Sequence, residues 1–375
     1  MSTTFEQAHA LDEVPAVAWN TLTHGHPLLD HGYLSSLEES GCVNHRTGWT
    51  PRHLIMKRDR EIVAAMPLYL KNHSRGEYVF DQSWAHAFER HGLHYYPKAV
   101  CAIPFTPVTG PRLLAHTAED QSALLEHAIE RCAHEGLSSL HVLFPPPEEL
   151  DALQTSGLLV RKSVQFHWMN TGYSDYNDFL MSMSQPKRKK IRQDTRKCEE
   201  AGVRFEVLEN KTLTPGALDF FYRCYRQTYF NHGQLPYLNR AFFSRLHTVM
   251  PEKMVMVLAY RHDRPVAAAM NIRGPSALYG RYWGCMEFIP GLHFETCYMR
   301  AIRYCIERNL KVFEGGAQGE HKLARGLSPT ETFSGHWIAD TRFKEAIENY
   351  LQQETRMLDS YTQELEEHSP FKAER

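Results

Sequence analysis

The feature that most constrains this fold is a short stretch of sequence that occurs twice. Residues 59–66 read D-R-E-I-V-A-A-M, and residues 263–270 read D-R-P-V-A-A-A-M. Each copy joins two apolar runs through an Asp-Arg turn, which is the pattern of a β-hairpin. A repeated supersecondary unit indicates internal duplication. At 375 residues the chain is also long for one hydrophobic core, so we expect two related modules.

A second match extends the repeat. Residues 27–37 (PLLDHGYLSSL) align with residues 236–246 (PYLNRAFFSRL), and each segment predicts a helix with Asp30 or Asn239 as its N-cap. In both halves this helix precedes the hairpin. The helix match is offset by 209 residues and the hairpin match by 204, so the first module carries the longer connection between them.

The rest of the chain alternates predicted strands and helices. Apolar patterns predict strands at 54–57, 62–70, 138–144, 158–168, 254–260, 266–272, 277–284 and 310–313, and helices at 122–134, 147–155, 293–308 and 342–365. A polar stretch near 170–185 marks a boundary. The expected fold class is therefore α/β, with modules at 1–175 and 176–375 whose mixed, largely antiparallel sheets are flanked by helices.

Composition excludes several classes of protein. The chain has 42 basic and 44 acidic residues, so no overall charge draws it to nucleic acid or membrane. No apolar run is long enough to span a bilayer, and the polar N-terminus favours a cytoplasmic protein. Its 8 cysteines form no C-x-x-C pair and its 22 histidines no H-E-x-x-H, so we expect no metal site.

Several longer motifs are shared with one known family. They are HSRGEYVFD (73–81), YYPK (95–98), PFTPVTGPR (104–112), QFHW (165–168), KRKKIRQ (187–193), YGRYWG (279–284) and FEGGAQGEHKLARG (313–326). On these motifs the chain resembles the FemAB-like branch of the tandem GNAT acyltransferases, a bacterial group labelled as peptidoglycan biosynthesis or recognition proteins. The resemblance spans nearly the whole chain and implies two GNAT-like modules.

The resemblance also implies an activity. It predicts direct transfer of an acyl or aminoacyl group to an amine, with the donor in the second module and the acceptor in the first module or between the modules. It implies no permanently bound cofactor, a donor that is acyl-CoA or aminoacyl-tRNA, and an acceptor that is a small-molecule or peptide amine. The text after Gly284, CMEFIPGLHFE, departs from the Q/R-x-x-G-x-G/A loop that holds a pyrophosphate in GNAT relatives.

The segment 314–325 (EGGAQGEHKLAR) carries the sharpest chemical signal. It follows a predicted strand, and its glycines let backbone N–H groups approach a ligand. The candidates are Gly315, Gly316 and Gly319 for the cofactor or donor, and Glu314 and Gln318 for the substrate.

Acyl transfer to an amine needs a base and a group that stabilises the oxyanion. Glu320 or His321 fits the base, and Lys322 or Arg325 fits the stabilising charge. The alternative is a glycine-rich turn whose charges are solvated.

Further candidates lie on other predicted elements. Arg281 and Trp283 share one face of a strand and are predicted to line a cleft, the alternative being a core Trp and a surface Arg. His293 and Glu295 begin the next helix, where a charge preference of the helix N-terminus is the alternative. In the first module the predicted acceptor-binding residues are Glu77, Tyr78, Asp81, Tyr95, Tyr96 and Lys98, and ordinary core packing is the alternative for each.

Residues 187–197 hold seven cations and one acid on a predicted helix. Such a helix is suited to tRNA phosphates, and the alternative is a solvated face with Ile191 turned inward. Three hypotheses follow: an N-acyltransferase, an aminoacyl-tRNA-dependent transferase that uses this helix, and a binding protein that has the fold without the chemistry.

Overall fold

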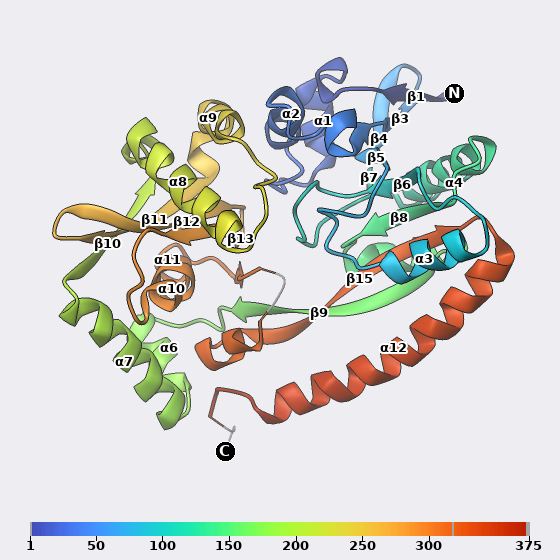
Figure 1. Ribbon diagram of the computed structural model, residues 1–375. Helices are drawn as coiled ribbons and strands as arrows, with labels where there is room; N and C mark the ends of the chain where they lie inside the picture. Colours follow the sequence, from blue (N-terminus) through green and yellow to red (C-terminus); the bar gives the residue numbers. More distant parts are fainter. Residues whose placement is uncertain (1, 317–318, 373–375) are drawn as a thin grey trace. The chain divides into compact units, whose positions relative to one another are not determined.

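The computed structural model describes residues 2–316 and 319–372, and the chain divides into two compact units (Figure 1). Unit 1 comprises Met1–Val164 and Glu331–Tyr361, and unit 2 comprises Gln165–Thr330 and Thr362–Arg375. The division therefore differs from the predicted single boundary at residue 175, because the stretch 331–361 returns to the first unit. Two long strands, β9 (Leu159–Met169) and β15 (Ser328–Ile338), carry the chain from one unit to the other.

Unit 1 contains strands of two sheets. One sheet has the order β1-β3-β4-β7, and the other strands follow the order β15-β8-β6-β5-β2. The strands are β1 (Thr3–Ala8), β2 (Trp49–Pro51), β3 (His53–Arg58), β4 (Glu61–Met66), β5 (Leu68–Lys71), β6 (Lys98–Cys101), β7 (Leu114–Ala115) and β8 (Ser139–Leu143). The helices are α1 (Ala16–Leu22), α2 (His31–Glu39), α3 (Gln82–Arg90), α4 (Ala118–His134), α5 (Leu150–Thr155) and α12 (Thr341–Glu367), the last of which ends in unit 2.

Unit 2 has one sheet with the order β10-β11-β12-β13-β14-β9. Its strands are β10 (Val203–Glu209), β11 (Met254–Arg261), β12 (Arg264–Arg273), β13 (Ala277–Cys285) and β14 (Val312–Glu314). The helices are α6 (Tyr176–Ser182), α7 (Gln185–Glu200), α8 (Pro215–Asn231), α9 (Arg240–Val249), α10 (Leu292–Phe294), the π-helix η6 (Glu295–Met299), α11 (Arg300–Glu307) and the 3₁₀-helix η7 (Glu320–Arg325).

The repeated sequence forms the same structure in both units. The Asp30 carboxylate accepts a hydrogen bond from the Gly32 amide at 2.7 Å and caps α2, and the Asn239 side chain accepts one from the Phe242 amide at 2.9 Å and caps α9. Each capped helix precedes a two-stranded hairpin, β3–β4 or β11–β12. The predicted N-caps and hairpins are confirmed.

The second hairpin turns one residue earlier than predicted. In the first copy Arg58 pairs with Glu61 and the turn is Asp59-Arg60, whereas in the second copy Arg261 pairs with Arg264 and the turn is His262-Asp263. The reason is Pro265, which occupies the place of Glu61 in the second copy. Proline has no amide hydrogen to close a hairpin turn, so the strands close at Arg264 instead.

The duplication extends over most of each unit. The strand order β1-β3-β4-β7 in unit 1 corresponds to β10-β11-β12-β13 in unit 2. In both units the fourth strand leads to a helical segment and then to a short strand, α4 and β8 in the first copy, α10–α11 and β14 in the second. The first copy differs by an insertion, β5–α3–β6, between its hairpin and β7.

Each unit has its own core. In unit 1, Leu124 and Leu125 of α4 pack with apolar residues of β3, β4, β6 and β8. In unit 2, α8 lies against β13 so closely that a Cβ atom at Gly284 would stand 2.1 Å from the Cys224 carbonyl oxygen. This position therefore requires glycine.

Candidate functional site

The parallel strands β13 and β14 separate and open a gap in the sheet of unit 2. They pair only where Ala277–Tyr279 lies beside Val312–Glu314. β13 continues to Cys285, but β14 ends at Glu314. Among the described residues, β13 therefore has no partner strand on this edge beyond Tyr279, although the Trp283 carbonyl oxygen accepts a hydrogen bond from the Thr228 hydroxyl at 2.9 Å. Unpaired backbone N–H and C=O groups at such an edge are able to bind a polar ligand.

A β-bulge lies at the point where the two strands separate. Met270 of β12 pairs with Tyr282, and the next residue, Asn271, pairs with Gly280. Arg281 is therefore the extra residue on β13. A bulge bends its strand and is common beside active sites. Here the bend coincides with the end of the β13–β14 pairing.

A cavity of about 110 Å³, measured as room for the centre of a water molecule, lies at this opening. Its walls come from β12, the bulged part of β13, the helical segment that follows β13, and the chain after β14. The lining side chains and glycines include Asn271, Gly280, Arg281, Tyr282, Trp283, His293, Cys297, Tyr298, Phe313, Gly315 and Gly316. The structure thus brings together the predicted residues Arg281, Trp283, Gly315 and Gly316, and also the candidate His293.

Two of the lining glycines are closely packed against their neighbours. A Cβ atom at Gly280 would stand 3.0 Å from the Phe313 ring and 3.1 Å from the Glu314 carbonyl oxygen. A Cβ atom at Gly315 would stand 2.6 Å from Leu327 and 3.3 Å from Tyr298. Side chains at either position would push against the walls of the cavity.

Lys322 is a buried cation beside this cavity. Its side chain comes from η7, it is 2% exposed, and its Nζ donates a hydrogen bond to the Gly316 carbonyl oxygen at 2.6 Å. Within the described residues, no carboxylate forms an ion pair with it. Burial lowers the pKa of Lys322 to about 8, although the nearby Cys297 thiol opposes that shift. An uncompensated buried ammonium is costly, and it is stabilised by an anion bound nearby.

His321 and His293 lie near Lys322. The Nε2 atom of His321 is 3.2 Å from the Tyr298 hydroxyl, and the His293 and His321 rings are 6.0 Å apart. His321 is an exposed residue, but partial desolvation of its ring, followed by the positive charges of Lys322 and Arg325, lowers its pKa. Burial, followed by the neighbouring His321 and the charges of Lys322 and Arg325, lowers the pKa of His293 to about 4. Both imidazoles are therefore neutral at pH 7 and able to accept a proton.

Arg325 holds the η7 segment against helix α7. Its Nη2 donates to the Asp194 carboxylate at 2.7 Å, and its guanidinium lies 4.0 Å from the centre of the Phe294 ring. Asp194 also pairs with Lys190 at 3.2 Å. Arg325 is therefore engaged within the protein, and of the two cations predicted to stabilise an oxyanion, Lys322 is the one without a carboxylate partner in the described structure.

The other candidates of the 314–325 segment have different positions. Glu314 is buried, and its Oε2 is 3.9 Å from the Nε2 atom of His167. Gly319 has φ of 113° and precedes η7, where a side chain would strain the backbone. Glu320 is exposed. Gln318 lies outside the described residues.

In unit 1 the predicted acceptor-binding residues form a buried polar cluster. Lys98 Nζ donates to Glu77 at 2.8 Å and also pairs with Asp81, while the Tyr95 hydroxyl donates to Asp81 at 2.6 Å. Burial raises the pKa of Glu77 to about 7. Burial would also raise the pKa of Asp81, but the charge of Lys98, the neighbouring His141 and hydrogen bonds from Lys98 and Ser74 together outweigh it and lower that pKa. Tyr78, which has φ of 61°, is 37% exposed.

This polar cluster continues into a pair of buried histidines. The Tyr95 hydroxyl is 3.1 Å from His141 Nε2, and the Nδ1 atoms of His141 and His336 are 2.6 Å apart. Asp81 precedes α3 at the N-cap position, but its carboxylate makes no cap hydrogen bond because it turns inward to Tyr95 and Lys98. The Tyr96 hydroxyl is 2.8 Å from the Ser74 hydroxyl at the edge of the cluster.

Sequence reasoning missed part of the cavity. Asn271 lies within an apolar strand pattern, and a polar residue in such a run was the available signal for it. Cys297 and Tyr298 fall within the predicted helix 293–308, where nothing marked them as site residues, but both line the cavity. The π-helix η6 carries both side chains, and the extra residue of a π-turn shifts a helix out of the regular period that a sequence pattern assumes.

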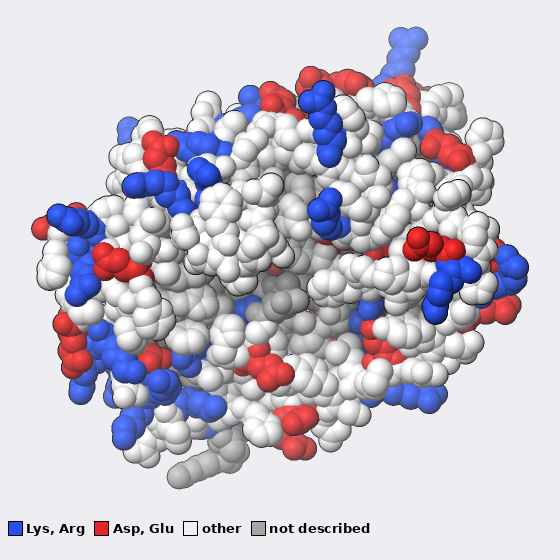
Figure 2. All heavy atoms as spheres, in the orientation of Figure 1, with Lys and Arg blue, Asp and Glu red and all other residues white. Residues whose placement is uncertain are grey.

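Helix α7 bears the basic run. Ile191 is buried, as expected for the alternative of a solvated helix face, with Asp194 and Cys198 on the same inward side. Lys189, Arg192 and Arg196 are exposed at i, i+3 and i+7, so they share an outward face. Figure 2 shows the lysine and arginine side chains gathered at its lower left, over the place of α7 in Figure 1.

Comparison with known proteins identifies the family. The profile of the FemAB-like family, described as peptidoglycan biosynthesis/recognition, matches residues 10–373. The chain belongs to the FemAB-like family. Its two α/β units are the tandem GNAT-like modules that the sequence motifs predicted. No curated protein matches the sequence.

Solved structures of FemAB-like and related folds resemble the chain over most of its length. FemX is 14% identical, with 92% of this chain and 100% of FemX covered and a TM-score of 0.56. The C-terminal domain described as that of a lysylphosphatidylglycerol synthetase from Agrobacterium fabrum is 9% identical, with 87% and 92% covered and a TM-score of 0.55. A protein of unknown function from Bacteroides thetaiotaomicron is 10% identical, with 89% and 99% covered and a TM-score of 0.53. These likenesses establish the fold.

Two further observations concern the described residues only. No group of three or more His, Cys, Asp or Glu side chains is arranged to hold a metal ion. None of the helices combines the length and apolar character needed to cross a membrane.

Proposed function

We propose that this FemAB-like protein is an N-acyltransferase that moves an acyl or aminoacyl group to an amine and binds the donor in unit 2. The observation that carries the proposal is Lys322, a buried ammonium beside the cavity at the β13–β14 opening that has no carboxylate partner among the described residues. A protein keeps such a charge where negative charge has to be stabilised. The family description supports an acyltransferase with a peptidoglycan-related acceptor.

The chemistry needs no covalent intermediate. The acceptor nitrogen attacks the acyl carbonyl carbon, a C–N bond forms, and the carbonyl oxygen becomes an oxyanion that the Lys322 ammonium stabilises. His321, neutral at pH 7, takes the proton that the nitrogen loses. Collapse of the intermediate breaks the C–O or C–S bond to the donor, and the leaving group takes up a proton. The unpaired edge of β13 holds the donor in place.

The N-terminus of α10, beside the cavity, bears on the choice of donor. Such an N-terminus is an anion-binding position. Here it is covered by α7, because a Cβ atom at Gly291 would stand 2.6 Å from the Asp194 carbonyl oxygen. The buried Glu295 carboxylate also lies in this first turn, where it accepts from the Thr195 hydroxyl at 2.9 Å and pairs with Arg300 at 2.9 Å. This arrangement disfavours a pyrophosphate and supports an ester donor over acyl-CoA.

The outward face of α7 supports the aminoacyl-tRNA-dependent transferase as a second candidate. Lys189, Arg192 and Arg196 present cations that are suited to phosphates. If tRNA binds there, log Kd should depend linearly on log salt concentration, and the double variant R192Q/R196Q, which removes two phosphate contacts, should lower the slope by roughly two units. A slope that is unchanged in this variant would count against the second candidate.

In unit 1 we propose that the exposed part of the polar cluster contacts the acceptor. Tyr78 and Tyr96 are accessible enough for direct contact, whereas Glu77, Asp81, Tyr95 and Lys98 are buried and would hold those tyrosines in position. The Y96F variant, which removes the hydroxyl bonded to Ser74, should raise the KM for the acceptor and leave the KM for the donor unchanged.

One experiment separates the hypotheses. Thermal denaturation is measured with acyl-CoAs, with aminoacyl-tRNA and with UDP-sugar peptides, because a ligand of the folded state raises Tm according to its concentration over Kd.

Product formation is then followed by mass spectrometry for the wild type, H321A, K322M and the control K311M, which changes an exposed lysine just before β14. H321A and K322M should lose activity and K311M should keep it. Full activity in K322M would refute the proposed role, and retention of cellular function by E320Q, H321A and K322M would favour a non-catalytic binding protein.

A further inference from the structure

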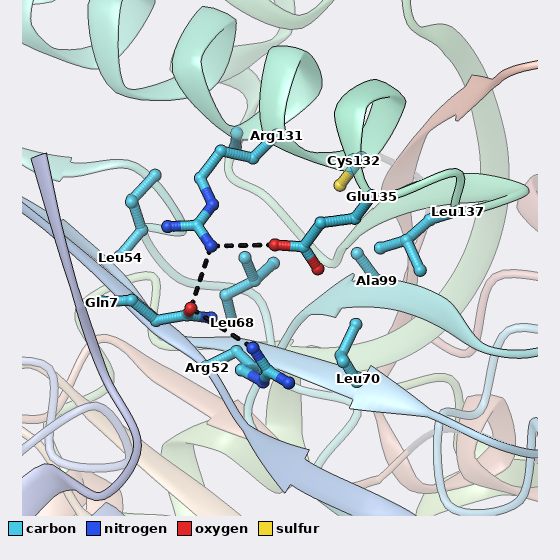
Figure 3. A pocket seen from close by; sticks show the side chains of 11 residues that line it. Gln7, Arg52, Leu54, Leu68, Leu70, Ala99, Arg131, Cys132, Glu135 and Leu137 are labelled. Carbon is cyan, nitrogen blue, oxygen red and sulfur yellow. Dashed lines mark hydrogen bonds and ion pairs between the residues drawn. The ribbon is translucent and has the colours of Figure 1, made fainter.

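We propose that a small cavity in unit 1, far along the chain from the residues of the proposed transferase site, binds a small monocarboxylate. The cavity lies between α4 and the strands β1, β3, β5 and β6 (Figure 3). Its walls are mainly apolar and its mouth is polar. The lining residues are Gln7, Arg52, Leu54, Leu68, Leu70, Ala99, Ala128, Arg131, Cys132, Glu135 and Leu137.

Two arginines converge on one neutral oxygen at the mouth of the cavity. Arg131 Nη2 donates to Gln7 Oε1 at 2.9 Å, and Arg52 Nη1 donates to the same oxygen at 3.3 Å. Figure 3 shows both guanidinium groups pointing toward Gln7. A guanidinium has donors only, so the amide oxygen of Gln7 has to face both of them. An amide oxygen carries no charge to balance the two cations.

The charge balance of this group favours an anion. Glu135 Oε1 accepts from Arg131 at 2.8 Å, and within the described residues no carboxylate pairs with Arg52. Two cations and one anion leave a net positive charge at the mouth. The Nε atom of Arg52 is also buried, and the part of the chain that the structure describes offers it no hydrogen-bond acceptor. A carboxylate is the group that satisfies a guanidinium best, since it can accept two parallel N–H donors.

The size and lining of the cavity define the rest of the ligand. The room for the centre of a water molecule is about 20 Å³, within about 350 Å³ of empty space that includes the open mouth. The enclosed part is little larger than one water molecule, so it suits a methyl or methylene group, and the carboxylate would lie in the open mouth beside the arginines. The apolar walls, formed by residues such as Leu70, Ala99 and Leu137, suit a methyl or methylene group. The ligand class is therefore an acetate- or propionate-sized acid.

Such a carboxylate has two sources, a free acid or the C-terminal glycine or alanine of a peptide. Binding is measured by calorimetry and by ligand-observed NMR on the full chain in chloride-free buffer at constant ionic strength. The probes are acetate, propionate, neutral acetamide, N-acetylglycine and N-acetylglycinamide. Acetate should bind with Kd on the order of 1 mM, which is reasonable for so few atoms, and acetamide should bind at least tenfold more weakly.

Variants test the assigned groups. R52Q should weaken acetate binding about tenfold, because it removes a charge-assisted hydrogen bond. E135Q should tighten it by about threefold to tenfold, because it removes a like charge from the mouth. A99V fills the cavity and should abolish binding while leaving the arginines in place. R90Q, which changes an exposed arginine at the end of α3, should have no effect.

The possible outcomes distinguish a peptide end from a free acid, and either of them from a cavity that binds no carboxylate. Tight binding of N-acetylglycine but not of its amide would show that the mouth admits the end of a peptide, whereas binding of acetate and propionate alone would identify a free acid. Equal binding of acetate and acetamide, or acetate binding unchanged by R52Q and A99V, would overturn the proposal and leave a water-filled cavity. None of these results depends on whether unit 2 is a transferase.

Discussion

Replacing Lys322 by methionine removes a buried ammonium while keeping a side chain of similar length. Burial lowers the pKa of this lysine from its ordinary value of 10.5 to about 8. One pKa unit corresponds to about 1.4 kcal/mol, so the charged lysine costs the folded state about 3 kcal/mol at pH 7. The variant also loses the hydrogen bond to the Gly316 carbonyl, which is worth about 1 kcal/mol. We therefore expect K322M to raise the free energy of unfolding by about 2 kcal/mol at pH 7.

The sign of the pH dependence makes this prediction specific. Below pH 8 the lysine is protonated in both states and the full cost is present. Between pH 8 and pH 10.5 the unfolded chain holds the proton and the folded protein has released it, so wild-type stability rises with pH. At pH 9.5 about 1 kcal/mol of the cost remains, and the advantage of K322M should be about zero.

Urea denaturation at pH 7 and pH 9.5, followed by circular dichroism, measures the difference between the two proteins. The control variant K311M, in which an exposed lysine is changed, should match the wild type at both pH values. If K322M is destabilised, or if its stability relative to the wild type is the same at both pH values, Lys322 is not an uncompensated buried charge. If the prediction holds and activity is lost, this residue is maintained for function at the expense of stability.

Three further predictions follow from particular groups. Transferase activity of the wild type should fall as pH rises through about 8, because Lys322 then loses its charge. K322R should shift this fall to higher pH, because a guanidinium stays protonated. A wild-type rate that rises through pH 8 would mean that Lys322 acts as a base instead. G284A should lower the free energy of unfolding by about 2 kcal/mol, because its Cβ would meet the Cys224 carbonyl oxygen, whereas the control G216A should leave it unchanged. Thermal unfolding measures both variants, and a G284A protein as stable as the wild type would contradict the packing described. Burial lowers the pKa of His26 to about 3, so below pH 6.5 the unfolded chain takes up a proton that the folded protein does not. By pH 5 this should lower the free energy of unfolding of the wild type by about 2 kcal/mol. Urea denaturation at pH 8 and pH 5 should show this loss in the wild type but not in H26Q.

Local signals made much of the fold predictable. Asp30 and Asn239 cap helices because their side chains satisfy amides that the helix leaves free, and this effect depends on a few adjacent residues. The hairpins were equally local, and even the shifted turn at Pro265 follows from the chemistry of one residue. The return of residues 331–361 to unit 1 depends on long-range strand pairing, which no local pattern encodes.

The candidate site was predictable in part. The glycines of the 314–325 segment indicated close approach of the backbone, and Gly315 and Gly316 line the cavity. The sequence did not distinguish Lys322 from Arg325, because only the fold shows that Asp194, on helix α7, is the partner of Arg325. The bulge at Arg281 was also hidden, since it is a property of the register between two strands and not of either strand alone.

The short parallel pairing between β13 and β14 suggests how the capacity of this site is set. Three residue pairs join the strands, and the cavity begins where they stop. Each further pair would close the opening by about 3.3 Å, and each pair removed would deepen it by the same step. In unit 1 the corresponding strands, β7 and β8, belong to different sheets and share no pairs. We therefore expect the length of this pairing to set the size of the group that the opening admits, independently of the side chains that line the cavity.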